Sequence, residues 1–268
     1  MGPILGPLVV TGILVNKIKD PEKIRDSKKL FVSRDKNSYA NLEREALAIL
    51  SQISNISSFH SIMDYCINLD EIRKICPGFF EMCFHNFSVP LWCGEDEIES
   101  KKKAIKESVK IEAVKFIIFC PRLFNSKIEQ SKLKIDFSGF IRIIEEYKRE
   151  GIKNFYCGKI GASSRYPIPN VGKIEKKERS HYLQDGGAEI QFILDGDEKV
   201  YEIALASIVG KYVRELSMLS LHNFFKKDKK DIYPVSGYRD SKTFIFLKGI
   251  ENQIKELGLD DICLIRKK

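Results

Sequence analysis

The stretch AEIQFILDGDEKVYEIALASIVGKYVRE, residues 188–215, decides how the fold is interpreted. AEIQFIL predicts a short buried strand, and the acidic triplet DGD follows it. From Glu198 to Phe225 the sequence predicts one long helix. A strand that leads directly into a helix is the repeating unit of α/β proteins.

Two carboxylates end the predicted strand, Asp195 and Asp197. On an extended segment, residues i and i+2 point to the same face, and Gly196 between them lets the backbone bend. Such a pair predicts a site for Mg²⁺ or Mn²⁺, which prefer hard oxygen ligands. The alternative is an ordinary turn and helix N-cap that binds nothing.

The predicted helix carries small residues on neighbouring turns: Ala204, Ala206, Ser207 and Gly210. Small side chains let a helix lie unusually close to another backbone, so we expect this helix to pack tightly on its neighbour. Close core packing without any functional role is the alternative interpretation.

Further helices and strands are expected on both sides of this stretch. Strands are predicted near 8–15, 58–65, 113–120 and 153–157, and helices near 39–50, 70–84, 137–151 and 236–258. The order of strands and helices favours an α/β fold with a mixed central sheet flanked by helices, and a C-terminal helical segment.

The chain shows no internal repeat and no linker rich in Pro, Gly or Ser. We therefore expect a single domain over 1–268, with a charged insertion at about 85–135. The run EDEIESKKKAIKESVKIE, residues 95–112, is dense in charges of both signs and predicts a solvated helix. We also expect a monomer.

Composition favours a polyanionic partner. Forty-five Lys and Arg against thirty-seven Asp and Glu give a net charge of +8, which suits nucleic acid. The seven cysteines are never spaced as CxxC, and the four histidines show no metal-ligand spacing. We expect reduced thiols in the core and a cytoplasmic protein, with neither disulfides nor a zinc site.

The N-terminal run MGPILGPLVVTG, residues 1–12, is unusually apolar. It lacks the charged start and cleavage site of a secretion signal and is too short to span a membrane. We expect it to begin inside a strand, as the continuation of a segment upstream of Met1.

Two other places carry side chains suited to a nucleic acid. Ser27, Lys28 and Lys29 form a turn that could contact phosphate by hydroxyl and charge, although surface lysines are usually only solvated. In the sequence SGY, a tight turn presents Tyr238, whose ring could stack on a sugar or base or could cap the core.

The order of these motifs resembles type 2 ribonuclease H, the ribonuclease HII family. GPILGPLVVTGIL, RDSKKL, DGDEKVYEIALASIVGKYVRE and SGYRDSKT follow one another, as do the family's GRGPxxGPLVVAG, NDSKKL, K(A/G)DxxxxxxAAASIxAKVTRD and GYP stretches. The match covers roughly residues 2–34 and 192–247 and is poor across about 50–150.

The resemblance implies a ribonuclease H fold that cuts RNA–DNA hybrids, or DNA 5′ of an embedded ribonucleotide, with divalent metal ions. It places the family's last metal-binding aspartate on Asp197, with Lys199 following in register. The remaining positions are carried over as follows: Ser27 and Lys28 to the phosphate loop, Tyr238 to the junction tyrosine, and Glu215 to a structural or supporting acid.

Three family carboxylates have no counterpart here. The Asp-Glu pair would precede GPILGP, and Gly158 stands where the third aspartate is expected. Either the protein is an inactive relative, or the true chain begins upstream of Met1; we favour the second interpretation. In a divergent branch with a glycine at this place, Asp195 could supply the third carboxylate.

The leading hypothesis is thus a metal-dependent endoribonuclease, impaired in this 268-residue chain by the missing acidic pair. A catalytically silent protein that kept the fold and the basic surface is the first alternative. A structural or interaction protein, which would not bind a hybrid duplex in a salt-dependent manner, is the second.

Overall fold

The computed structural model describes residues 3–17, 19, 35–76, 78–127, 131–161, 163, 165–168, 171–176, 179–184, 186–226, 233–260 and 263–267. Its strands are β1 (Leu8–Lys17), β2 (Val109–Phe119), β3 (Asn154–Gly158), β4 (Val171–Lys176), β5 (Arg179–Gln184) and β6 (Glu189–Ile193). Its helices are α2 (Lys36–Leu50), α3 (Phe59–Met63), α4 (Leu69–Ile75), α5 (Phe79–Met82), α6 (Glu95–Ser108), α7 (Pro121–Ser126), α8 (Lys132–Arg149), α9 (Gly196–Lys199), α10 (Tyr201–Phe225) and α11 (Ser241–Glu256).

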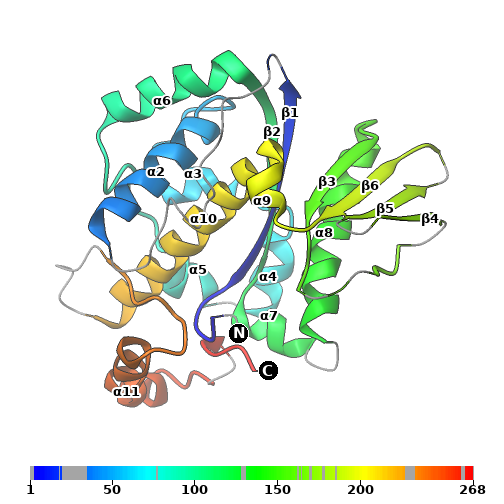
Figure 1. Cartoon of the computed structure of the whole chain (residues 1–268). Helices are drawn as coiled ribbons and strands as arrows, with labels where there is room; N and C mark the ends of the chain where they lie inside the picture. Colours follow the sequence, from blue (N-terminus) through cyan, green and yellow to red (C-terminus); the bar gives the residue numbers. More distant parts are fainter. Residues whose placement is uncertain are drawn as a thin grey trace.

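The described strands form two sheets. β1 and β2 pair antiparallel over their full length, from Leu8 opposite Phe119 to Lys17 opposite Val109. The second sheet has the order β3-β6-β5-β4, with β3 parallel to β6 and the other pairs antiparallel. Figure 1 shows the β1–β2 pair through the centre of the molecule and the second sheet to one side.

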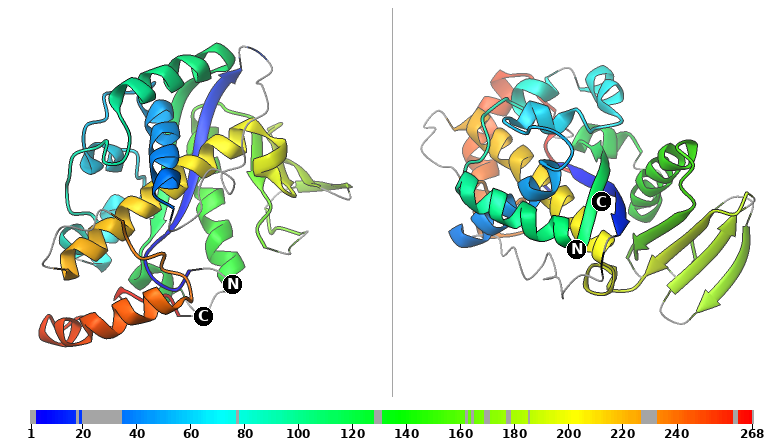
Figure 2. Two further views of the ribbon diagram at one scale, coloured as in Figure 1. Left: turned by 60° about the vertical axis from the view of Figure 1, so that its left-hand side comes forward. Right: turned by 90° about the horizontal axis from the view of Figure 1, so that it is seen from above.

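Helices α8 and α10 enclose β1. An ideal Cβ placed on Gly139 of α8 would lie 2.8 Å from Val10, and one placed on Gly210 of α10 would lie 2.7 Å from Thr11 Oγ1. Val10 and Thr11 point to opposite faces of the strand, so the two helices cover opposite faces. The two views in Figure 2 agree with this arrangement.

α10 runs through the core. It is buried on nearly all sides, with Val209, Tyr212, Val213 and Leu216 fully covered. A helix that is apolar around its circumference must be covered around its circumference. α2 covers a large part of α10. At its N-terminal end α10 contacts α9, the short helix that follows β6.

Most of the predicted elements are confirmed. The helices predicted from 39–50, 137–151 and 236–258 are α2, α8 and α11, and the strands predicted at 113–120 and 153–157 are parts of β2 and β3. The strand predicted near 58–65 is wrong. Ser58 accepts a hydrogen bond from the Ser61 N–H and, in a capping box, starts the short helix α3 instead.

The helix predicted at 70–84 is divided into α4 and α5. Cys76 ends α4 with a non-helical backbone, as expected for a residue that precedes proline. Strands β4 and β5, which pair as a hairpin, were missed altogether. Their sequences lack a clear apolar alternation, because β4 pairs only with β5 at the edge of the sheet.

The charge-dense run 95–112, predicted as a solvated helix, forms α6 and, from Val109 on, the start of β2. The rest of 85–135 includes β2, whose residues Phe116 to Phe119 are fully buried and which is β1's partner. The β1–β2 sheet therefore depends on part of this range, and the insertion expected over 85–135 stays a prediction.

The expected single central sheet is not observed among the described residues: β1 and β3 belong to different sheets. The expectation that the N-terminal run continues an upstream strand is also wrong. β1 is a ten-residue strand of its own that begins at Leu8. Before it, Gly6 has the left-handed φ of 77°, and the Ile4 and Leu5 N–H groups both donate to the Gly237 carbonyl.

The cysteines behave as predicted: all seven are free thiols, and six of them are buried. Burial raises the pKa of the Cys66 thiol to about 12, which keeps it protonated and unreactive. None of the described helices combines the length and apolar character needed to cross a membrane.

Candidate functional site

The DGD triplet lies where β6 turns into α9. β6 ends at Ile193, and Asp195 adopts a left-handed backbone with φ 52° and ψ 42° before α9 begins at Gly196. This conformation is uncommon for a residue other than glycine and occurs chiefly for Asn and Asp in turns. Asp195 and Asp197 are thus not on an extended segment, and the same-face argument made from their spacing is wrong.

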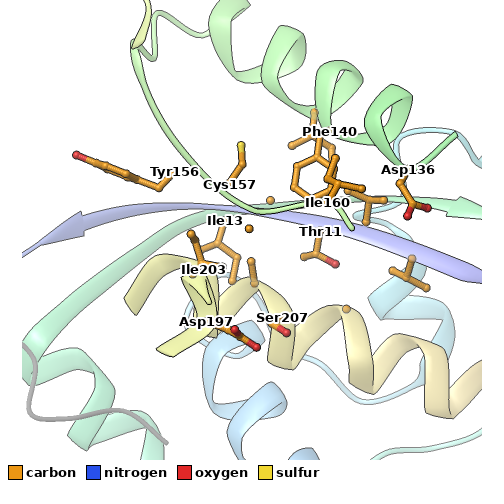
Figure 3. A pocket seen from close by; sticks show the side chains of 18 of the residues that line it. Thr11, Ile13, Asp136, Phe140, Tyr156, Cys157, Ile160, Asp197, Ile203 and Ser207 are labelled. Carbon is orange, nitrogen blue, oxygen red and sulfur yellow. The ribbon is translucent and has the colours of Figure 1, made fainter. Parts of the chain in front are cut away.

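The turn nevertheless directs both aspartates to one cavity. Asp195 is exposed and Asp197 is partly buried in the first turn of α9, and both line a cavity of about 1440 Å³ between β1 and β3. Figure 3 shows Asp197 on the α10 side of that cavity, near Ser207. The structure therefore brings the two predicted residues together, by a turn and not by a strand.

Gly158, the place of the expected third carboxylate, lies beside the triplet. An ideal Cβ on Gly196 would lie 3.4 Å from the Gly158 Cα and 2.7 Å from Ile203 Cδ1. The glycine at 196 is what lets the ends of β3 and β6 approach α10 this closely. Gly158 itself contributes backbone only.

The carboxylates at this place do not complete a cation site. Among the described residues, no group of three or more His, Cys, Asp or Glu side chains is arranged to hold a metal ion. Mg²⁺ normally requires six oxygen ligands, some of which can be water or substrate phosphate. Asp195 and Asp197 would supply some of these ligands, and three further acids, Asp136, Glu202 and Glu215, line the same cavity.

The small residues of α10 serve close packing, as predicted. Ala206, Ser207 and Gly210 line the cavity on the α10 side, and Gly210 packs directly against Thr11 of β1. Ala204 is buried. The helix therefore lies against β1 with little side chain between them.

Glu215 is a buried acid held by two partners. Arg214 Nη1 donates to Glu215 Oε1 at 2.5 Å, and the Tyr39 hydroxyl lies 3.4 Å from Oε2. Burial raises the pKa of the Glu215 carboxyl, an effect that Arg214 opposes. This environment suits the structural role expected for Glu215, because the carboxylate joins α10 to α2.

Tyr238 lies at the edge of the same cavity and is 45 % exposed. The Arg214 guanidinium lies 5.4 Å from its ring centroid, and Arg214 Nη2 donates to the Ser236 carbonyl at 2.7 Å. Gly237 has the left-handed φ of 71° that the tight turn requires. The ring is therefore partly exposed to solvent and lies beside the Arg214 cation.

The remaining residues predicted to contact the nucleic acid are Lys199 and the group Ser27, Lys28 and Lys29. Lys199 is exposed at the end of α9. Ser27, Lys28 and Lys29 lie outside the described residues, so their predicted phosphate contact stays a prediction.

Sequence reasoning missed a second group of polar side chains at the opposite end of the cavity. Asp136 of α8 and Arg266 of the C-terminal segment both line it. Burial raises the Asp136 pKa to about 6 and, with Arg214 nearby, lowers the Arg266 pKa to about 10. Asp136 could have been suspected as an acid inside the apolar pattern of α8, whereas nothing in the sequence marks Arg266.

The comparisons with known proteins show sequence similarity over one part of the chain. The chain is 30 % identical to the ribonuclease HII of Bartonella henselae over 89 residues, which is 33 % of this chain and 36 % of that protein. The ribonuclease HII proteins of Bartonella quintana and Bartonella bacilliformis are 28 % and 30 % identical over stretches of the same length. No family model matches the sequence. No solved structure matches it either.

The matched stretch thus spans about a third of this chain and about a third of each relative. The chain has a mixed α/β fold, and over that third it is similar to ribonuclease HII.

Proposed function

We propose that this protein is a nuclease of the ribonuclease H type that acts on RNA–DNA hybrids or on DNA containing a ribonucleotide. The observation that carries the proposal is the Asp195–Gly196–Asp197 turn at the edge of a large cavity, next to Gly158 and the small-residue face of α10. The local likeness to ribonuclease HII supports the same assignment.

The proposal gives each group a distinct task. Asp197 and Asp195 contribute negative charge and oxygen ligands toward Mg²⁺ or Mn²⁺. Tyr238, 45 % exposed beside Arg214, provides a surface on which a sugar or base can stack. Lysines 28, 29 and 199, with Ser27, would contact phosphates and thereby position the duplex.

The described residues do not by themselves hold a metal, so we expect this 268-residue chain to cut slowly or not at all. A chain extended by the residues encoded in frame upstream of Met1 is expected to cut a duplex with one embedded ribonucleotide. Changing Asp197→Asn in that extended chain should lower the rate by at least about 100-fold, because even outer-shell partners of metal ligands contribute about 10- to 100-fold.

Glu198→Gln is the matched control. Glu198 lies in α9 beside Asp197 but is exposed and does not line the cavity, so its substitution should leave the cleavage rate unchanged. Full activity of Asp197→Asn, or an equal loss in both variants, would refute the site.

A catalytically silent hybrid-binding protein is the second candidate. The shortage of gathered carboxylates among the described residues favours it. It predicts that the extended chain binds the hybrid, with an affinity that falls as salt rises, and never cuts it with either ion.

A further inference from the structure

Two arginines, Arg214 and Arg266, line the end of the cavity that lies away from the DGD turn. Arg214 projects from α10, and Arg266 belongs to the segment 263–267 that follows α11. Asp136 of α8 lines the same end. In Figure 3, Asp136 lies on the far side of the cavity from Asp197. These groups therefore form a second polar cluster, separate from the two aspartates.

The backbone around Arg266 is fixed on two sides. The Arg266 N–H donates to the Ile4 carbonyl at 2.8 Å. On the other side, Asn125 of α7 donates to the carbonyl of the preceding residue and accepts from the N–H of the following one, each at 2.7 Å. The Arg266 guanidinium lies 5.6 Å from the centroid of the Phe124 ring, a cation–π distance. These contacts hold the side chain in the interior.

The Arg266 guanidinium is buried with unused donors. The residue is 5 % exposed, and its Nε and Nη2 have no hydrogen-bond partner within the described part of the chain. These two nitrogens share one edge of the guanidinium, and their parallel N–H groups match two oxygens of a phosphate or carboxylate. Buried polar groups are normally hydrogen-bonded, and a buried charge without partners is costly. This edge therefore lacks an acceptor.

The neighbouring charged groups do not supply that acceptor. Arg214 already donates to Glu215 and to the Ser236 carbonyl, and its Nε is buried without a partner in the described structure. Asp136 Oδ1 is buried without a partner there as well. Burial and the nearby Arg214 cation lower the pKa of Arg266 to about 10. Two neighbouring cations with unused donors would thus be stabilised by an anion between them.

We propose that this end of the cavity binds one phosphate-class oxyanion, and we call Arg214, Arg266 and Asp136 the arginine site. On binding, the long Arg266 side chain turns its Nε–Nη2 edge toward the cavity, and two oxygens of the anion accept from it. A third oxygen accepts from Arg214 Nε. A tetrahedral anion suits three donors from two guanidiniums better than a carboxylate, which has two oxygens. The phosphate group belongs either to a free anion or to a polynucleotide backbone.

This inference goes beyond the proposed function and does not rest on it. A protein that never cuts a hybrid can still bind phosphate at the arginine site. Equally, cleavage at Asp195 and Asp197 does not require an anion at Arg266.

Isothermal titration calorimetry of the 268-residue chain tests the site. Inorganic phosphate and, separately, sulfate are titrated at pH 7, with the ionic strength held constant by chloride. We expect one anion to bind per chain with a dissociation constant of about 1 mM or below. The absence of saturable binding at roughly ten times that concentration would overturn the proposal.

Two substitutions separate the guanidinium edge from its charge. Arg266→Met should weaken phosphate binding at least about tenfold, because it removes both the charge and the edge. Arg266→Lys keeps the charge but lacks the planar edge, so it should weaken binding at least about fivefold. Wild-type affinity in either variant would overturn the proposal.

Arg149→Met is the matched control. It also removes one positive charge, but Arg149 has a side chain that is 70 % exposed on α8 and does not line the cavity. Its phosphate affinity should stay within about twofold of wild type, because solvent and salt screen an exposed charge. Equal losses in Arg149→Met and Arg266→Met would show that only net charge attracts the anion, which would overturn the site.

Asp136→Asn keeps the test independent of how well the Arg266 variants fold. This change removes a negative charge that faces the anion, so phosphate should bind at least about threefold more tightly at pH 7. Circular dichroism checks that each variant is folded. An unchanged or weaker affinity in folded Asp136→Asn would place the anion elsewhere and overturn the proposal.

An RNA–DNA hybrid, titrated without divalent metal and followed by fluorescence anisotropy, distinguishes the two sources of the phosphate group. A backbone phosphate predicts that Arg266→Met weakens hybrid binding and that free phosphate competes with the hybrid. A free anion predicts that neither changes hybrid affinity. Phosphate binding without cleavage would refute only the proposed function, and cleavage without phosphate binding would refute only the arginine site.

Discussion

Glu43 is the buried residue whose replacement tests the packing around α10 most directly. It lies on α2 with no exposed surface. Its Oε1 accepts hydrogen bonds from the Leu91 N–H at 2.8 Å and the Tyr212 hydroxyl at 2.9 Å. Its Oε2 accepts from the backbone N–H groups of Trp92 and Cys93. One carboxylate thus fixes a loop and α10 to α2.

The change Glu43→Gln keeps the shape and removes half of this acceptor capacity. The amide oxygen can still serve two donors, but the NH₂ group faces two other donors. Hydrogen bonds to charged groups contribute about 1.5–3 kcal/mol each, so two lost bonds correspond to about 3–6 kcal/mol. Removing a buried charge offsets part of the loss. We therefore expect the free energy of unfolding to fall by about 2–4 kcal/mol, a large part of the roughly 5–15 kcal/mol typical of a domain.

Urea denaturation followed by circular dichroism measures this effect. The midpoint should move to lower urea with an unchanged slope. Glu99→Gln is the control, since Glu99 lies on α6 with its side chain 57 % exposed and pairs with Lys102 at 3.1 Å, an interaction worth at most about 1 kcal/mol. The reasoning is refuted if Glu43→Gln costs no more than Glu99→Gln.

Three further predictions test other parts of the molecule. Asp136→Asn should stabilise the protein at pH 7 by up to about 3 kcal/mol. The fold raises the pKa of Asp136 from 3.8 to about 6 and so favours the protonated carboxyl, which means that wild-type stability falls as pH rises between these values. The urea midpoints of the variant and the wild type should converge near pH 4, and a gain that persists at pH 4 would contradict the raised pKa as its cause. Gly139→Ala should destabilise the protein by about 1–2 kcal/mol, because the added methyl group would press on Val10. Gly249→Ala, in open space on α11, should instead stabilise the protein by about 0.5–1 kcal/mol. Equal shifts of the melting temperature in the two variants would refute the packing argument. Tyr238→Ala should weaken hybrid binding at least about fivefold in fluorescence anisotropy, given about 1–3 kcal/mol per stacked base, and an unchanged affinity would exclude stacking.

The sequence alone determined the local structure where periodicity was strong. The helical spacing of α2, α8 and α11 and the apolar run of β2 were sufficient, because one buried face or a fully buried strand leaves a clear pattern. It failed at α3, where a side-chain cap at Ser58 prevailed over a short apolar run, and at β4, an edge strand with no pattern to detect.

For the site, the sequence identified Asp195, Asp197 and the small-residue face of α10 but assigned the aspartates the wrong geometry. A left-handed turn, set by contacts of Gly196 with Ile203 and Gly158, directs them to the cavity. Those contacts join residues from β3, α9 and α10, so no local pattern encodes them.

Only the tertiary structure placed Asp136 and Arg266 at the same cavity, because 130 positions of sequence separate them. It also decided that β1 and β3 belong to different sheets and line the same cavity. Strand pairing depends on which backbone groups meet in space, and the backbone is the same for every residue type. The side-chain pattern could therefore predict the strands but not which of them pair.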